Sequence, residues 1–191
     1  MRRSLPAVLG SALMLSGCMS LPAGEHQPSF ETVTTLRDSP IAKLNVDKFA
    51  LAKGVDPAMD RSIGSRGNSI KPPGSTTFSQ YLKDSLTADL RAAGKYDPAS
   101  AIVVRGELFD SQLSTGLSMG SAALAARIYV VHNGNIVYDR VLHEHRSWDS
   151  SVIGLVAIPE AMNQYLDQYS ALLKQLYVDP QFLKACAAAA P

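Results

Sequence analysis

The sequence predicts an α+β domain in which two helices pack on one face of a four-stranded, mostly antiparallel sheet. Apolar residues recur every three or four positions in segments 75–94 and 154–178, which is typical of amphipathic helices. Apolar and β-branched runs at 44–49, 102–109, 122–132 and 136–141 indicate strands. The element order is therefore β-α-β-β-β-α, and packing both helices on one face is the simplest way to bury their apolar stripes.

Local signals place the ends of these elements. Ser75, Thr76 or Thr77 can cap the first helix, and Gly94 can end it. The Asn133-Gly134 step between two apolar runs predicts a tight hairpin. The second arm of this hairpin extends to Trp148, which we expect to pack on its own domain. Residues 111–120 are rich in Ser, Thr and Gly and are interpreted as a flexible connection.

The loop at 54–74 is rich in glycine and proline, and a loop this long in a compact domain is either functional or partly disordered. It carries Arg66 and Lys71 toward the predicted helix start, where the amides of Ser75, Thr76 and Thr77 are expected to be free. Free amides at a helix N-terminus attract anions. These five residues are the candidate site for a lipid phosphate, a glycan carboxylate or an acidic loop of a partner. A solvated loop without a ligand is the alternative, and it is favoured.

The first 17 residues have the order of an export signal. Arg2 and Arg3 precede an apolar run at 5–15, which ends in small residues. This run is about half of the ~20 residues that a membrane-spanning helix needs. We therefore expect export without a transmembrane anchor.

The stretch Leu15-Ser16-Gly17-Cys18 resembles the lipobox of bacterial lipoproteins. The resemblance implies that the signal peptide 1–17 is removed and that Cys18 carries the acyl chains that anchor the protein. Several acyl chains together give stable membrane binding. An ordinary secreted protein with a free Cys18 thiol is the alternative. Met19 stands where Asp favours retention at the inner membrane, so the resemblance implies the periplasmic face of the outer membrane.

The remaining chain divides into three parts. Residues 18–40 are expected to form a lipidated flexible tether, because they are rich in Pro, Ser, Thr and Gly and show no apolar period. Residues 41–180 form the predicted periplasmic domain. Residues 181–191 form an alanine-rich tail, in which Cys186 is most simply a tail thiol.

The element order is similar to that of the amino-terminal domain of the Tol-Pal translocation protein and of ABC-type transport auxiliary lipoproteins. The segments Phe78–Gly94 and Gly154–Leu176 carry this resemblance. It implies a non-enzymatic accessory or assembly role in an envelope transport machine. The implied partners are another envelope protein or a second copy of the chain, with a lipid or a glycan as further ligands.

Composition argues against other classes of function. The chain has 18 basic and 17 acidic residues, so nothing in its charge indicates nucleic-acid binding. No hydrolase motif is found, and we expect no enzyme activity and no cofactor. His143 and His145 share one face of a strand and, with His132, could form a metal site, but exposed polar positions on the sheet explain them without further assumptions and are favoured. No metal is therefore expected, and a lipid-anchored hydrolase or metalloenzyme remains the weakest alternative.

The uncharged run at 152–158 has two interpretations. As core, it would be the buried entry to the last helix. As surface, it would be a patch that faces another subunit or lipid. The core interpretation is favoured.

Overall fold

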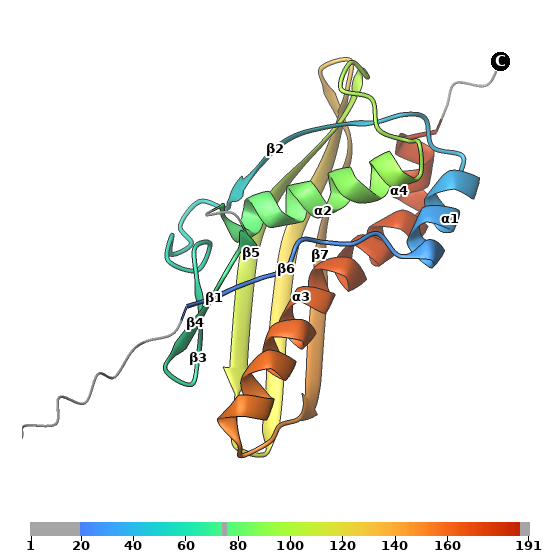
Figure 1. Ribbon diagram of the computed structural model, residues 1–191. Helices are drawn as coiled ribbons and strands as arrows, with labels where there is room; N and C mark the ends of the chain where they lie inside the picture. The colour runs from blue at the N-terminus through green and yellow to red at the C-terminus, as the bar shows by residue number, and fades with distance from the viewer. Residues whose placement is uncertain (1–19, 74–75, 188–191) are drawn as a thin grey trace, which may run out of the picture.

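The structure, a computed structural model, describes residues 20–73 and 76–187 (Figure 1). Its main sheet has the strand order β2-β5-β6-β7. The strands are β2 (Asn45–Leu51), β5 (Ile102–Thr115), β6 (Met119–His132) and β7 (Asn135–Asp149). The pairs β5-β6 and β6-β7 are antiparallel, whereas β2 runs parallel to β5. The predicted four-stranded, mostly antiparallel sheet is confirmed.

Two long helices, α2 (Phe78–Ala92) and α3 (Gly154–Val178), lie on one face of this sheet (Figure 1). Helix α2 contacts β2 and β5, and α3 contacts β5, β6 and β7. The core between them is aromatic: the rings of Phe78 and Tyr165 are 5.2 Å apart, and those of Tyr81 and Tyr169 are 5.1 Å apart, both edge to face. The predicted packing of two helices on one face is confirmed.

The three predicted local signals act as expected. The Thr77 side chain caps α2 by accepting a hydrogen bond from the amide of Gln80, at 3.2 Å. Gly94 ends the helix with φ +73°, and the amide of Lys95 donates to the carbonyl of Leu90, as in a Schellman motif. The β6–β7 turn has positive φ at both Asn133 and Gly134, which a tight hairpin turn requires.

The strands β5 and β6 are longer than predicted. The segment interpreted as a flexible connection, 111–120, instead continues β5 to Thr115 and starts β6 at Met119. The Ser111 hydroxyl is buried and pairs with the hydroxyl of Tyr165 at 2.5 Å. A polar residue in this strand is thus compatible with the core because α3 supplies its hydrogen-bond partner.

The amino-terminal segment is more ordered than a tether. Strand β1 (Ser20–Pro22) is followed by helix α1 (Phe30–Asp38), which the side chain of Ser29 caps. Leu36 of α1 is fully buried. The prediction of a flexible tether is therefore wrong for residues 20–40, because a capped helix with a buried leucine anchors this segment to the domain.

The predicted long loop contains a second, smaller sheet. Strands β3 (Ile63–Ser65) and β4 (Asn68–Lys71) form an antiparallel hairpin, and β1 pairs with β4 in parallel. Arg66 and Gly67 make the turn, both with positive φ. This hairpin attaches the amino-terminal strand to the rest of the fold.

The carboxyl-terminal segment is also part of the core. Helix α4 (Pro180–Ala185) places Phe182 against the ring of Tyr138, and Cys186 is fully buried. The expectation of a tail is therefore wrong for residues 181–187, and Cys186 is no tail thiol. Its burial raises the pKa of the Cys186 thiol to about 12.

Candidate functional site

The segment 23–29, called the strap below, crosses from β1 to α1 beside helices α2 and α3 (Figure 1). His26 fastens it. The His26 Nε2 atom is 2.8 Å from Asp89 Oδ1 on α2, and Nδ1 is 3.4 Å from the Ser170 hydroxyl on α3. Asp89 also accepts a hydrogen bond from the Tyr177 hydroxyl at 2.8 Å. We call these four side chains the clasp.

The clasp is closed to solvent at its centre. Asp89 is 1% exposed and Tyr177 is 2% exposed. Burial, reinforced by the Asp89 carboxylate, raises the pKa of Tyr177 well above its usual range, so the hydroxyl stays protonated and donates. A buried carboxylate is stable only when it is paired, and Asp89 has two partners.

The order Ser170, His26, Asp89 superficially matches a hydrolase triad. Ser170, however, lies inside α3, where backbone amides donate to carbonyls of the preceding turn. An oxyanion hole needs free donors beside the nucleophile, and the helix around Ser170 provides no free amide. The arrangement therefore holds the strap in place and gives no support to catalysis.

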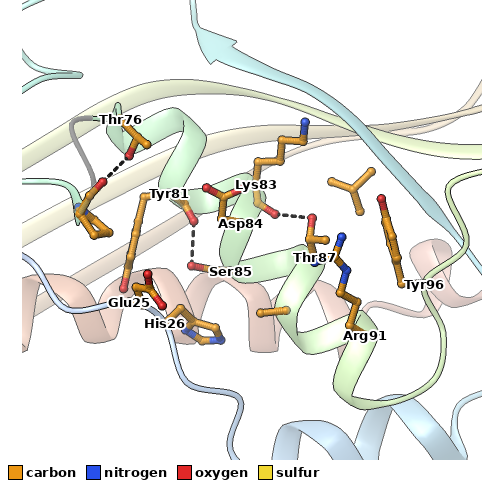
Figure 2. A pocket seen from close by; sticks show the side chains of 13 residues that line it. Glu25, His26, Thr76, Tyr81, Lys83, Asp84, Ser85, Thr87, Arg91 and Tyr96 are labelled. Atoms are coloured by element: carbon orange, nitrogen blue, oxygen red, sulfur yellow. Dashed lines mark hydrogen bonds between the residues drawn. The ribbon is translucent and has the colours of Figure 1, made fainter.

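A cleft of about 490 Å³ runs beside the strap, along α2 (Figure 2). Two of its hydroxyl groups are used within the helix: Ser85 donates to the carbonyl of Tyr81 and Thr87 to that of Lys83, both at 2.8 Å. The Arg91 guanidinium lies 4.7 Å from the centre of the Tyr96 ring. The charges around the cleft are mixed, and they come from Glu25, Lys83, Asp84 and Arg91.

Tyr81 forms part of the cleft wall. Burial raises the pKa of its hydroxyl to about 12, so it acts as a neutral hydrogen-bonding group near neutral pH. The cleft thus combines an aromatic wall with opposite charges. It contains no activated nucleophile among the residues that the structure describes.

The predicted anion site is not assembled. At the start of α2, the Ser79 amide and hydroxyl both donate to the carboxylate of Asp60, at 2.6 and 2.8 Å. The Phe78 amide donates to the Asp60 carbonyl. The first amides of the helix are therefore satisfied by a buried acidic residue of the chain itself. Of the amides that were expected to be free, that of Thr76 donates to the Pro73 carbonyl at 3.4 Å.

The five predicted residues of that site are dispersed. Thr77 is the helix cap, and Thr76 lines the cleft while its hydroxyl donates to the Pro73 carbonyl. Lys71 is exposed at the end of β4. Arg66 sits at the opposite end of the β3–β4 hairpin. Ser75 and the lipidation residue Cys18 lie outside the described residues.

Arg66 instead connects two loops at the end of the sheet. Its Nε donates to the Thr115 carbonyl at 2.9 Å and its Nη2 to the Gly116 carbonyl at 2.7 Å. Its Nη1 donates to the Val152 carbonyl at 3.3 Å. The guanidinium therefore joins the β5–β6 turn to the loop before α3, and most of its donors are used.

These two loops display the apolar tip, a cluster of side chains that are each between 53% and 89% exposed. Its members are Leu117, Met119, Val152, Ile153, Leu155 and Val156. The core interpretation of 152–158 is therefore wrong for four of its residues, although Ala157 is buried. Trp148 nearby is 8% exposed and packs over Gly120, which confirms that it binds its own domain.

His143 and His145 are exposed on β7, opposite Ala125 and Ala123 of β6. His132 lies at the far end of the same hairpin, paired with Asn135. Within residues 20–73 and 76–187, no three metal-binding side chains come together.

No model of a protein family matches this chain, and no curated protein matches it in sequence. The structure is similar to that of a Xanthomonas campestris protein described as DUF330, with a TM-score of 0.55 and 15% identity, over 84% of this chain and 95% of that one. It also overlaps a minor lipoprotein from Acinetobacter baumannii, with a TM-score of 0.47 and 18% identity, over 78% and 98%. The first similarity shows a shared fold.

The sequence contains one signal for the clasp. Asp89 stands between Leu86 and Leu90 on the apolar stripe of α2, and a carboxylate in a buried stripe requires a partner. Nothing in the pattern identifies His26 as that partner, because the two residues are 63 positions apart.

Proposed function

We propose that this protein is a lipid-anchored lipoprotein of the bacterial envelope that serves as a non-enzymatic accessory or assembly component of an envelope transport machine. The observation that carries this proposal is the place of Cys18. The cysteine of the lipobox-like stretch is separated from the first residue of β1 by Met19 alone. The folded domain begins where the lipid anchor ends.

The absence of a long tether has a consequence for function. The clasp and α1 hold the amino-terminal segment against the domain, so the domain stays close to the membrane surface. No helix in the described part of the chain is long and apolar enough to cross a membrane. Acyl chains on Cys18 would therefore provide the attachment.

The face of the sheet opposite α2 and α3 supports a contact role. It carries ion pairs between Arg105 and Asp47, at 2.8 Å, and between Arg127 and Asp139. Phe109 and Val141 are 38% and 45% exposed. A mixed surface of charges and apolar groups is typical of non-obligate protein interfaces. The proposed partner is another envelope protein.

Metabolic labelling with palmitate tests the anchor. The wild-type chain is expected to take up label and to lose residues 1–17, and Cys18→Ala is expected to do neither. Cys186→Ala is the matched control and should label normally. Label that persists in Cys18→Ala would contradict the anchor.

Photo-crosslinking in cells tests the accessory role. A crosslinker at Val141, on the open face, is expected to capture a defined envelope protein, whereas one at Asp84 on α2 should not. Repeated recovery of the monomer alone from the Val141 position would count against the role.

Density-gradient separation of membranes tests the proposed outer-membrane location. Met19→Asp should shift the protein toward the inner membrane in an enterobacterial host.

A further inference from the structure

The apolar tip exposes large apolar side chains to an extent that is unusual for a protein surface. Leu155 is 89% exposed and Val152 is 71% exposed, in the first turn of a helix and just before it. Ile153 occupies the N-cap position and makes no side-chain cap, although Ser, Thr, Asp or Asn would stabilise the helix there. The exposed apolar side chains and the isoleucine at the N-cap position add nothing to the stability of the isolated fold. They therefore point to a contact made by the tip.

Charged residues are sparse at the tip. No Asp, Glu, Lys or Arg occurs in 111–126, which contains the β5–β6 turn, or in 150–159, which contains the start of α3. Arg66 reaches this end with its guanidinium bound to backbone carbonyls, and the exposed Asp149 lies opposite Met119 at the rim of the tip. An apolar cluster with charges at its rim is suited to the hydrocarbon side of a membrane interface.

The place where the chain leaves the fold lies on the same side of the molecule. Ser20 pairs with Ser69, two residues after Gly67 at the turn of the β3–β4 hairpin. Because β1 is parallel to β4, its amino-terminal end faces this turn. The neighbouring Arg66 bonds directly to the loops of the tip. Two peptide steps separate Ser20 from Cys18, a reach of at most about 7 Å.

From this placement we infer that the apolar tip inserts into the phospholipid bilayer to which Cys18 is anchored, as a second membrane contact. The inference rests on the proposed lipoprotein anchor. With acyl chains already in the membrane, a weak affinity of the tip for lipid is sufficient, because its effective concentration at the surface is high. Its insertion fixes the orientation of the domain, with α3 starting at the membrane and the β6–β7 turn pointing away.

Fluorescence on lipidated full-length protein tests the inference. In a Cys186→Ala background, Leu155→Cys is labelled with NBD, and the protein is reconstituted in vesicles of phosphatidylethanolamine and phosphatidylglycerol. Ile136→Cys is the matched control, because Ile136 is 60% exposed at the opposite end of the sheet. The probe at 155 is expected to shift to the blue and to be quenched by doxyl-labelled lipid, and the probe at 136 is not.

Two results of this experiment would overturn the inference. An unquenched probe at 155 would show that the tip stays in water. A blue shift without vesicles that grows with protein concentration would show that a second copy covers the tip.

Flotation of a Cys18→Ala chain that lacks residues 1–17 separates failure of the anchor from failure of the tip, because the apolar run at 5–15 would otherwise bind vesicles itself. Leu155→Ser with Val156→Ser is expected to lower the partition into vesicles by about tenfold or more, from the apolar area lost. Ile136→Ser with Val137→Ser should leave it unchanged. Equal partition of both pairs would contradict membrane insertion by the tip, whatever palmitate labelling shows for Cys18.

Discussion

The clasp and the apolar tip use their residues in opposite ways. At the clasp, every polar group has a partner: Asp89 binds both His26 and Tyr177 in a buried position. At the tip, large apolar side chains are exposed and the helix lacks a side-chain cap. The first region therefore contributes mainly to the stability of the fold. The second contributes little to stability and is available for contact with another surface.

The largest loss in the free energy of unfolding is expected at the clasp. Asp89→Ala leaves the Tyr177 hydroxyl and His26 without their common acceptor, which should lower the free energy of unfolding by about 3 kcal/mol. Urea unfolding measures this. Asp84→Ala is the matched control on the same helix, since Asp84 is exposed and accepts a hydrogen bond from the side chain of Gln80. Equal losses in the two variants would show that the clasp is not a stabilising centre.

The second-largest loss in the free energy of unfolding is expected at Asp179, which connects α4 to β7. Its carboxylate accepts from Tyr138, Arg140 and the amide of Gln181, at 2.9, 2.8 and 2.8 Å. Asp179→Ala should cost about 2 kcal/mol, because the cap of α4 and the contacts with β7 are lost together. Thermal and urea unfolding measure the loss.

Asp179 also predicts a pH dependence. Burial alone would raise the pKa of its carboxyl group, but the hydrogen bonds from Arg140, Gln181 and Tyr138 hold it below the usual range. A lowered pKa contributes stability above the unfolded value of about 4, and this stability is lost as the pH falls through the folded pKa. The wild type should therefore lose more stability on acidification than Asp179→Ala, and parallel curves would contradict this.

A smaller effect of opposite sign is expected within α3. Gln168 is fully buried, and its side-chain amide has no hydrogen-bond partner among the described residues. Gln168→Met removes this unpaired polar group and should raise the free energy of unfolding by about 1 kcal/mol. Gln164→Met is the control, because it removes an acceptor for Arg146 and brings no such gain. Destabilisation by Gln168→Met would show that the amide is bonded in solution.

The smallest effect on stability is expected at the tip. Leu155→Ser should change the free energy of unfolding by less than about 0.5 kcal/mol, because the side chain is already exposed. Leu172→Ala, in the buried face of the same helix, should cost about 3 kcal/mol. The melting temperatures of the two variants give the comparison directly. A large loss in Leu155→Ser would mean that the tip is part of the core.

Much of the fold could be predicted because its signals are local. The capped helix ending at Gly94, the Asn133-Gly134 turn and the helix before Pro180 each follow from a short pattern in the chain. The strap could not be predicted, since it is held by contacts between His26 and residues far away in the sequence. Residues 152–158 were assigned to the core because a run of apolar residues looks the same whether it is buried or used as a contact surface.

The candidate site was predicted less well than the fold. Arg66 was predicted to belong to an anion site, but its guanidinium donates to backbone carbonyls at the tip. The helix start was expected to offer free amides to an anion, but Asp60 accepts from the amides of Phe78 and Ser79, the second of them 19 positions away. Sequence patterns identify groups that need a partner, and they do not show when the chain supplies that partner itself.

The strap has a consequence for the order of maturation. Strands β5, β6 and β7 form a meander with short connections, so we expect them to fold early. The bonds of His26 close loops of 63 and 144 positions, and contacts of such separation form late because of the entropy of loop closure. Under the proposed lipoprotein anchor, Cys18 would therefore remain accessible to the acylating and cleaving enzymes until the clasp closes. Docking of His26 would then mark the step at which the anchored chain becomes a domain held close to its membrane.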